Sequence, residues 1–324
     1  MSNKLLVVSD NAGDLEFAKA AAETSGLEVQ KEANPERAAE IIRDENVRVI
    51  FVDCADEATF FKFEAAIRDK VGLFSDKINA NSMHYLSSQD LQNIQGIFQS
   101  PIFGHYIFRN FGDPPTAGRR YGQILKATLL DRSFGLQHFF PEATKVQRVV
   151  FEHSLKKQEG VEAVKNYLLA ANFKTRMATV IANAVDELLM NAMYDAPVDA
   201  MGKALYVATP RNTPIDLKDK HAVEMHVAFD KDYVAVTAVD HFGSLDKVKL
   251  FSHMSKRYIE EEYKVKTSVA GAGIGLATVF RSGGSFCFAS EAGVKTEVTV
   301  FFKRTDNFRE FKDQFRFIST QFYF

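Results

Sequence analysis

ATVIANAVDELLMNA, residues 178–192, has the spacing of a helix that is buried along one side. Its apolar residues recur at intervals of three and four, at Ile181, Val185, Leu188, Leu189 and Ala192. Asn183, Glu187 and Asn191 then lie on the opposite face, where a carboxylate and a carboxamide can hold a hydrated divalent cation. Because Glu-x-x-x-Asn is also common on solvated helices, the pair gains meaning only from its surroundings.

Composition and charge place the chain among ordinary globular proteins. It has 324 residues, of which 46% are apolar and 25% are charged, and its net charge is −2. This balance gives no electrostatic reason to bind nucleic acid or an anionic membrane surface. The length predicts two domains.

Cysteine usage and hydropathy predict the compartment. Cys54 and Cys287 lie far apart, and no Cys/His cluster has the spacing of a zinc site. The N-terminal apolar run is too short for a signal peptide, and no stretch approaches the roughly 18 apolar residues of a membrane span. We therefore expect a soluble, cytoplasmic protein without a disulfide framework, a structural metal or a membrane segment.

The first 110 residues or so alternate between strand and helix patterns. Strands are predicted at 4–8, 27–30, 47–52, 83–87 and 106–108, and helices at 15–24, 35–44 and 90–98. This alternation indicates a small, doubly wound α/β domain, whose functional groups lie at the carboxyl ends of its strands. The clearest buried strand, VRVIFV, ends on Asp53.

At those strand ends the sequence resembles a response-regulator receiver domain. Ser9 and Asp10 stand where the acidic pair would be, and Asp53 where the phosphorylated aspartate would be. Ser87 matches the hydroxyl residue, and Arg109 replaces a lysine. Since magnesium-dependent phosphoryl transfer needs clustered carboxylates, the loss of one acid to Ser9 implies a degenerate receiver. The alternative is that Asp53 merely ends a strand before a turn.

The segment GDPPTAG, residues 112–118, is the clearest break in the chain, because two prolines and two glycines continue neither periodic pattern. The helix predicted at 119–131 either ends the first domain or connects the two. We place a receiver-like domain at 1–113, a connector at 114–144 and a second domain at 145–324.

The second domain is predicted to begin with an extended run at 147–156. Helices are predicted at 160–171 and from 175 onward, and strands at 222–229 and 233–239. Asp240 comes directly after the second of these strands and is followed by His-Phe-Gly-Ser. An ionised aspartate accepts hydrogen bonds and donates none, which suits the exocyclic amine of adenine. Gly243 would let the chain turn under the ring. By itself the motif is equally typical of a turn after a strand.

A glycine-rich loop follows, in which Gly271, Gly273 and Gly275 alternate and Leu276 leads into a helical pattern. Glycines at alternate positions remove the Cβ atoms that would keep the backbone away from phosphates, and a helix N-terminus offers free amides to an anion. A dinucleotide fingerprint and a P-loop both need glycine where Leu276 stands, so neither motif is met. A surface turn is the alternative for an isolated loop of this kind.

The order of these pieces is more specific than any one of them. The Glu/Asn helix is followed by the strand ending in Asp240, a lid-length segment, the glycine loop, and a turn with a strand at 293–302. Over about 146–302 this order resembles the ATP-binding domain shared by histidine kinases, gyrase, heat-shock chaperones, mismatch-repair ATPases and anti-sigma-factor serine kinases. The resemblance implies a two-layer α/β sandwich, of the α+β class, that binds ATP and Mg²⁺.

The resemblance also implies a role for each motif. Glu187 would activate a water or a hydroxyl, Asn191 would ligate magnesium, and Asp240 would read adenine. Thr296, at the start of the last strand, would support Asp240, while the loop at 271–276 would close over the phosphates.

The sequence departs from this pattern at two positions. Ser244 follows Gly243 where a second glycine is usual, and Tyr194 stands where many histidine kinases have a lysine. A phosphate contact would therefore be missing at Tyr194. The charged segment at 252–270 would form the lid over the nucleotide.

The segment that precedes the ATP-binding motifs indicates which branch of this superfamily the chain resembles. The only histidines in the interval, His138 and His153, do not lie in a long amphipathic helix, as a phosphoacceptor histidine would. A strand and a short helix before the Glu/Asn helix look more like an anti-sigma-factor serine kinase, a branch that phosphorylates or sequesters a partner protein. We expect a two-component-like signalling protein in which the receiver-like domain regulates a kinase-type ATPase domain that acts on a protein partner.

Two other functions stay open on the sequence alone. One is a non-catalytic, nucleotide-gated module that binds a protein partner, and the other is an atypical histidine kinase using His138 or His153. The tail carries Phe308, Phe311 and Phe315 at helical spacing. These side chains are expected to pack on the ATPase sheet, and the alternative is a surface for a homodimer or a partner.

Overall fold

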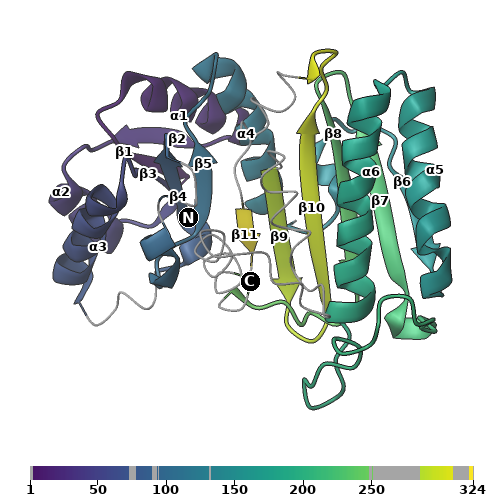
Figure 1. Cartoon of the computed structure of the whole chain (residues 1–324). Helices are drawn as coiled ribbons and strands as arrows, with labels where there is room; N and C mark the ends of the chain where they lie inside the picture. Colours follow the sequence, from purple (N-terminus) through teal and green to yellow (C-terminus); the bar gives the residue numbers. More distant parts are fainter. Residues whose placement is uncertain are drawn as a thin grey trace. The chain divides into compact units, whose positions relative to one another are not determined.

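The computed structural model describes residues 3–72, 78–89, 93, 95–130, 133–247, 250, 285–308 and 321–323. The chain divides into two compact units, Met1–Ser133 and Phe134–Arg316, with the end of the chain shared between them. One unit contains a parallel sheet and the other an antiparallel sheet (Figure 1). The prediction of a mixed α/β and α+β chain is confirmed at this level.

The first unit is built on five parallel strands in the order β2-β1-β3-β4-β5. They are β1 (Lys4–Val8), β2 (Glu28–Lys31), β3 (Val47–Asp53), β4 (Met83–Ser87) and β5 (His105–Phe108). The three central strands are runs of buried residues, as expected when helices cover both faces of a parallel sheet. This strand order is common in doubly wound sheets, where ligands bind near the carboxyl ends of the first and third strands.

Two pairs of helices cover this sheet, α1 with α4 on one face and α2 with α3 on the other (Figure 1). Their bounds are α1 (Ala12–Ser25), α2 (Pro35–Asp44), α3 (Glu57–Val71) and α4 (Pro114–Thr128). Gly118 and Gly122, one turn apart on α4, let it approach α1 closely. A Cβ atom at Gly118 would lie 2.2 Å from the carbonyl oxygen of Phe17. From the sequence, the helix predicted at 119–131 either ends the first domain or forms a connector. It belongs to the first unit.

The start of α4 corrects the predicted break at 112–118. The helix begins at Pro114, and Asp113 caps it by accepting a hydrogen bond from the Thr116 amide at 3.0 Å. Proline is tolerated in the first helical turn because the amides there have no helical partner. The helix predicted at 90–98 differs as well, since the described part of this segment contains only a short 3₁₀ helix, η4 (Gln95–Gln99).

The second unit has a six-stranded sheet in the order β11-β9-β10-β8-β7-β6, and the pairs from β6 to β9 are antiparallel. The strands are β6 (Gln147–Phe151), β7 (Val223–Phe229), β8 (Tyr233–Asp240), β9 (Ser285–Glu291), β10 (Lys295–Lys303) and β11 (Gln321–Tyr323). Helices α5 (Lys157–Ala170) and α6 (Thr175–Met190) pack against each other, and α6 contacts β7, β8 and β10 (Figure 1). Strand β9 was not predicted.

The stretch 178–192 forms most of helix α6 and continues into the following turn, and its buried stripe is the predicted one. Asn183 is exposed, whereas Glu187 and Asn191 are partly buried at the margin of the stripe. The helix then widens into a π-helical turn, η7 (Asn191–Asp195). The segment 196–222 leads from η7 to β7, and its regular structure is limited to a short 3₁₀ helix, η8 (Asp219–His221), just before β7.

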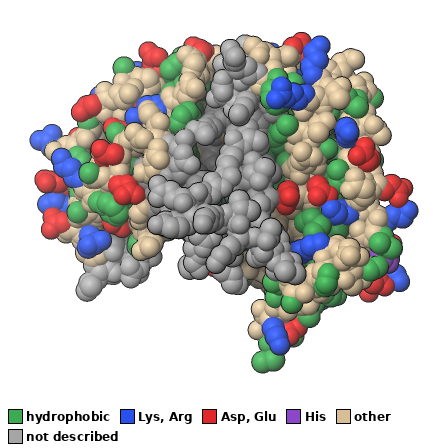
Figure 2. Space-filling model, viewed as in Figure 1, with side chains coloured by type: hydrophobic (Ala, Val, Ile, Leu, Met, Phe, Trp, Pro, Cys, Tyr) green, Lys and Arg blue, Asp and Glu red, His purple; other side chains and the backbone are tan. Residues whose placement is uncertain are grey.

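Charged side chains of both signs are interspersed over the visible surface of each unit, in keeping with the net charge of −2 (Figure 2). In the part of the chain that the structure describes, no helix has the length and apolar character needed to cross a membrane.

Candidate functional site

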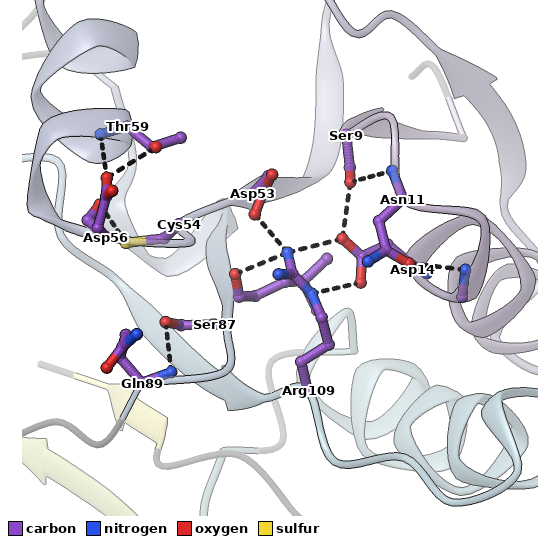
Figure 3. Close-up of polar contacts among 12 residues, drawn as sticks. Ser9, Asn11, Asp14, Asp53, Cys54, Asp56, Thr59, Ser87, Gln89 and Arg109 are labelled. Carbon is purple, nitrogen blue, oxygen red and sulfur yellow. Dashed lines mark hydrogen bonds and ion pairs between the residues drawn. The ribbon is translucent and has the colours of Figure 1, made fainter.

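The carboxyl ends of the first unit's strands hold an ionic cluster centred on Arg109, which directly follows β5 (Figure 3). Its Nε donates to Asp14 Oδ1 at 2.8 Å, and its Nη2 donates to Asp14 Oδ2 at 2.9 Å. The same Nη2 atom bonds to Asp53 at the end of β3, and lies 3.2 Å from the carbonyl oxygen of Leu86. One guanidinium thus connects two carboxylates, with the two-pronged geometry that makes arginine–carboxylate pairs strong.

Asp14, and not the predicted Asp10, is the second acid of this cluster. Asp14 is fully buried, and the Ser9 hydroxyl donates to its Oδ2 at 2.7 Å. The Asp10 side chain is 88% exposed and pairs with Lys31 at 3.5 Å. Asp10 therefore lies outside this cluster: it follows β1 in an exposed turn, whereas Asp14 is the first buried residue of α1.

A sequence signal for Asp14 existed. It precedes Phe17 and Ala18 by three and four positions, so it belongs to the buried face of α1. A carboxylate on a buried helix face requires a partner, which Arg109 and Ser9 provide here.

Ser87 and Asp53 lie where the strand-end prediction placed them. Ser87 is buried at the end of β4, and its hydroxyl oxygen accepts a hydrogen bond from the Gln89 amide at 3.1 Å. The Arg109 amide donates to the Ser87 carbonyl at 2.8 Å. The Asp53 side chain is 31% exposed.

The cluster does not fit the magnesium ion of a receiver domain. A magnesium site needs carboxylate oxygens that are free to coordinate the ion, but both acids here hydrogen-bond to Arg109. Burial opposes the charge on the guanidinium, yet its hydrogen bonds to Asp53 and Asp14 outweigh this effect and raise the pKa of Arg109. A permanent cation thus stands between the two carboxylates.

In the second unit, Asp240 ends β8 directly opposite Thr296 of β10. The aspartate is only 5% exposed. Its Oδ1 accepts a hydrogen bond from the Phe242 amide at 2.9 Å, and the Thr296 hydroxyl also donates to the carboxylate. Burial raises the pKa of Asp240 to about 6 despite these hydrogen bonds, so the carboxylate is ionised at neutral pH.

The loop after Asp240 is held against the turn between β9 and β10. Gly243 has a φ of +55°, and a Cβ atom there would lie 1.9 Å from the carbonyl oxygen of Glu291. The Gly293 amide donates to the Gly243 carbonyl at 3.3 Å. Only glycine meets both the left-handed conformation and the close approach, which gives the Asp-x-x-Gly motif a structural reason.

Asn191, the first residue of η7, has a buried side-chain nitrogen without a hydrogen-bond partner. The Ser244 hydroxyl donates to the Ala196 carbonyl at 2.7 Å, so the loop after Asp240 is tied to the end of η7. Glu187 lies one turn before Asn191 on α6 and is partly buried. The structure thus joins the segments that carry Asn191 and Asp240 through a direct hydrogen bond.

The remaining predicted positions of this site, Gly271, Gly273, Gly275 and Leu276, lie outside the described residues, as does the lid at 252–270. Among the residues that are described, no group of three or more histidine, cysteine or acidic side chains is arranged to hold a metal ion.

Sequence reasoning missed a polar cluster on β7, centred on Glu224. Its carboxylate accepts hydrogen bonds from Arg148 at 2.6 Å and from His226 Nε2 at 2.8 Å, and His241 lies 3.4 Å away. Burial would raise the pKa of Glu224, but the Arg148 and His226 hydrogen bonds lower it overall. Glu224 and His226, two apart in an otherwise apolar strand, could have indicated a shared polar face.

Comparison with models of known families gave no match for this chain, and comparison with curated proteins gave none either.

Proposed function

We propose that the second unit binds ATP with Mg²⁺ and acts on a protein partner, as a kinase-type ATPase of a signalling protein, while the first unit is a degenerate receiver-like domain that regulates it. The observation that supports this proposal most strongly is the environment of Asp240. A carboxylate is buried at a strand end, opposite a hydroxyl partner on Thr296, beside a loop that requires Gly243.

The chemistry of this environment suits an adenine ring. The described partners of the Asp240 carboxylate are hydrogen-bond donors, which include the Phe242 amide and the Thr296 hydroxyl. An ionised carboxylate that is buried beside neutral donors gains from a further donor, and the exocyclic amine of adenine is one.

The phosphates and their metal would lie toward α6. The side-chain oxygen of Asn191 would be a magnesium ligand, and Glu187, one turn earlier, would accept a proton from a water or a hydroxyl nucleophile. When bound, the metal would neutralise charge on the phosphate oxygens. The buried, unpartnered amide nitrogen of Asn191 fits a site completed by a ligand.

Calorimetric titration of Mg²⁺–ATP into the wild type and the Asp240→Asn variant tests this proposal. A hydrogen bond to a charged group contributes about 1.5–3 kcal/mol, so we expect affinity to fall by roughly tenfold to a hundredfold. Asp232→Asn makes the same chemical change at the exposed end of the same hairpin and should leave the affinity unaltered. Unaltered affinity in Asp240→Asn would contradict the proposal.

The Glu187→Ala variant distinguishes a kinase or ATPase from a nucleotide-gated binding module. An enzyme should lose most of its phosphate transfer or hydrolysis while it still binds ATP. Equal, near-zero turnover in the variant and the wild type would favour the binding module. The cytoplasmic location and a homodimer stay predictions from the sequence.

A further inference from the structure

Arg211 lies on the segment between η7 and β7 and is held against the π-helical turn by several contacts. Its Nη2 donates to Asp195 Oδ1 at 2.7 Å, and its guanidinium carbon lies 4.9 Å from the centre of the Tyr194 ring. The Tyr194 hydroxyl donates to the carbonyl oxygens of Arg211 and Thr213, at 3.0 Å each. Both the backbone and the side chain of Arg211 are therefore fixed in place.

One nitrogen of this fixed guanidinium is not satisfied. Arg211 Nη1 is buried and has no hydrogen-bond partner, and the same holds for Asn191 Nδ2. Arginine gives up hydration at a cost, so a buried N–H group of a guanidinium normally meets an acceptor.

The two unsatisfied nitrogens belong to one local structure. The Ala196 amide donates to the Asn191 carbonyl at 2.9 Å, which is the five-residue spacing of a π-helix. Asn191 and Asp195 are thus about one turn apart on the same side of η7. Because Asp195 holds Arg211, the two side chains with an unsatisfied nitrogen are both anchored to this turn.

We propose that Arg211 and Asn191 form an anion subsite that binds a phosphate group of the nucleotide. The subsite rests on the proposed ATP-binding function and adds a residue to it. Phosphate oxygens are acceptors only, they match the forked donors of arginine, and their charge balances a guanidinium that Asp195 pairs with on one side alone. Asn191 would give its oxygen to the metal and its nitrogen to the phosphate.

This subsite also accounts for the contacts that Tyr194 makes with Arg211. A lysine at this position would provide a cation from the helix itself, whereas here the tyrosine ring supports a cation that arrives from the following segment. Its hydroxyl fixes the backbone on both sides of that cation. Arginine stacked on an aromatic ring is preorganised, so less freedom is lost when it binds a ligand.

The test compares ATP with adenosine in Arg211→Gln and Arg211→Lys variants, with Arg176→Gln as a control at an exposed arginine of α6. We expect Arg211→Gln to weaken ATP binding tenfold or more, Arg211→Lys to weaken it less, and neither to change adenosine binding. Retained adenosine binding shows that the variants fold. Equal weakening of ATP and adenosine, or no weakening of either, would overturn the subsite.

Inorganic tripolyphosphate separates failure of the subsite from failure of the proposed function. If Asp240→Asn weakens adenosine binding but Arg211→Gln leaves the ratio of ATP to adenosine affinity unaltered, ATP binding stands and the subsite is wrong. If the wild type binds tripolyphosphate in an Arg211-dependent way but binds no adenosine, the subsite stands and the role of Asp240 is wrong.

Discussion

Polar side chains cluster both at the strand ends of the first unit and in the α6–β8 region of the second unit. The two clusters differ in whether their hydrogen-bonding groups find partners within the protein. In the first unit, the Arg109 guanidinium bonds to Asp14, Asp53 and a carbonyl oxygen. In the second, buried nitrogens of Asn191 and Arg211 have no acceptor. The first arrangement is complete within the protein, whereas the second leaves donors that the proposed nucleotide would satisfy.

The two regions also balance buried charge in different ways. A guanidinium compensates Asp14, whereas the described partners of Asp240 include an amide and a hydroxyl. Neutral donors compensate a buried charge less than an ion pair does, and the pKa of Asp240 rises to about 6 as a consequence of its burial. At the strand ends of the first unit, the arginine between two acids thus forms a structural ion-pair network.

The largest effect is expected when the network of the first unit is broken. Arg109→Leu leaves the buried Asp14 without its cation, so we expect the free energy of unfolding to fall by about 3–5 kcal/mol in urea denaturation. Arg119→Leu removes an exposed arginine of α4 that donates a hydrogen bond to Thr116, and should change stability by less than about 0.5 kcal/mol. Equal, small losses in both variants would show that the network is not needed for stability.

Removing the charge of Asp240 in the second unit should instead increase the free energy of unfolding. An acid with a raised pKa loses its proton more readily in the unfolded state, so the penalty of Asp240 on folding builds up as the pH rises from its ordinary pKa of 3.8 toward 6 and is fully present above 6. Without nucleotide at pH 7.5, we expect Asp240→Asn to raise the free energy of unfolding by about 1–2 kcal/mol. Thermal and urea unfolding measure this change. A loss of stability in the variant would mean that the charge is already well compensated.

The affinity for ATP should depend on pH in the same range. If the ligand amine binds the ionised form of Asp240, protonation competes with binding. We therefore expect the affinity to fall by about tenfold for each pH unit below 6 and to be nearly constant from pH 7 to 8. Titration of the wild type between pH 5 and 8 measures this, and a flat profile would contradict an ionised Asp240 in the complex.

The smallest effect concerns two histidines in the core of the first unit. His84 and His105 are buried with their ring centres 4.5 Å apart, and His84 Nδ1 shares a hydrogen bond with the Tyr121 hydroxyl at 2.6 Å. Burial, with a smaller contribution from His105, holds the pKa of His84 well below 6.5. The unfolded chain then binds the extra proton, so stability falls as the pH drops below 6.5.

Between pH 7 and 5.5 we expect this histidine to reduce the stability of the first unit by about 1 kcal/mol. Hydrogen exchange of the β4 and β5 amides reports the change in this unit. Protection that increases on acidification would contradict the prediction.

Periodicity and strand ends predicted much of this arrangement. The convergence of Asp53, Ser87 and Arg109 follows from parallel strands that end at one edge of a sheet. The pairing of Thr296 with Asp240, which only the family resemblance implied, is produced by the antiparallel register of β8 and β10. Local sequence did not show which of two nearby acids turns inward, because Asp10 and Asp14 are separated only by the turn that begins α1.

Other features of the fold are indicated only weakly by the sequence, or not at all. Strand β9 contains alternating Phe286 and Phe288, but its whole length is buried except for the last residue, which hides a two-residue period. Arg211 lies in a segment without a regular repeat, so only the fold shows that it returns to η7. The proline pair at the start of α4 looked like a break because prolines in a first turn and in a loop are alike in sequence.

Hydrogen–deuterium exchange with and without Mg²⁺–ATP tests most directly whether one region is a ligand site and the other is not. We expect ATP to slow exchange in the segments 191–196 and 240–244, and to leave 9–14, 53–56 and 87–89 unaltered. Slower exchange at the Arg109 cluster, or no change in the second unit at saturating ATP, would contradict the account.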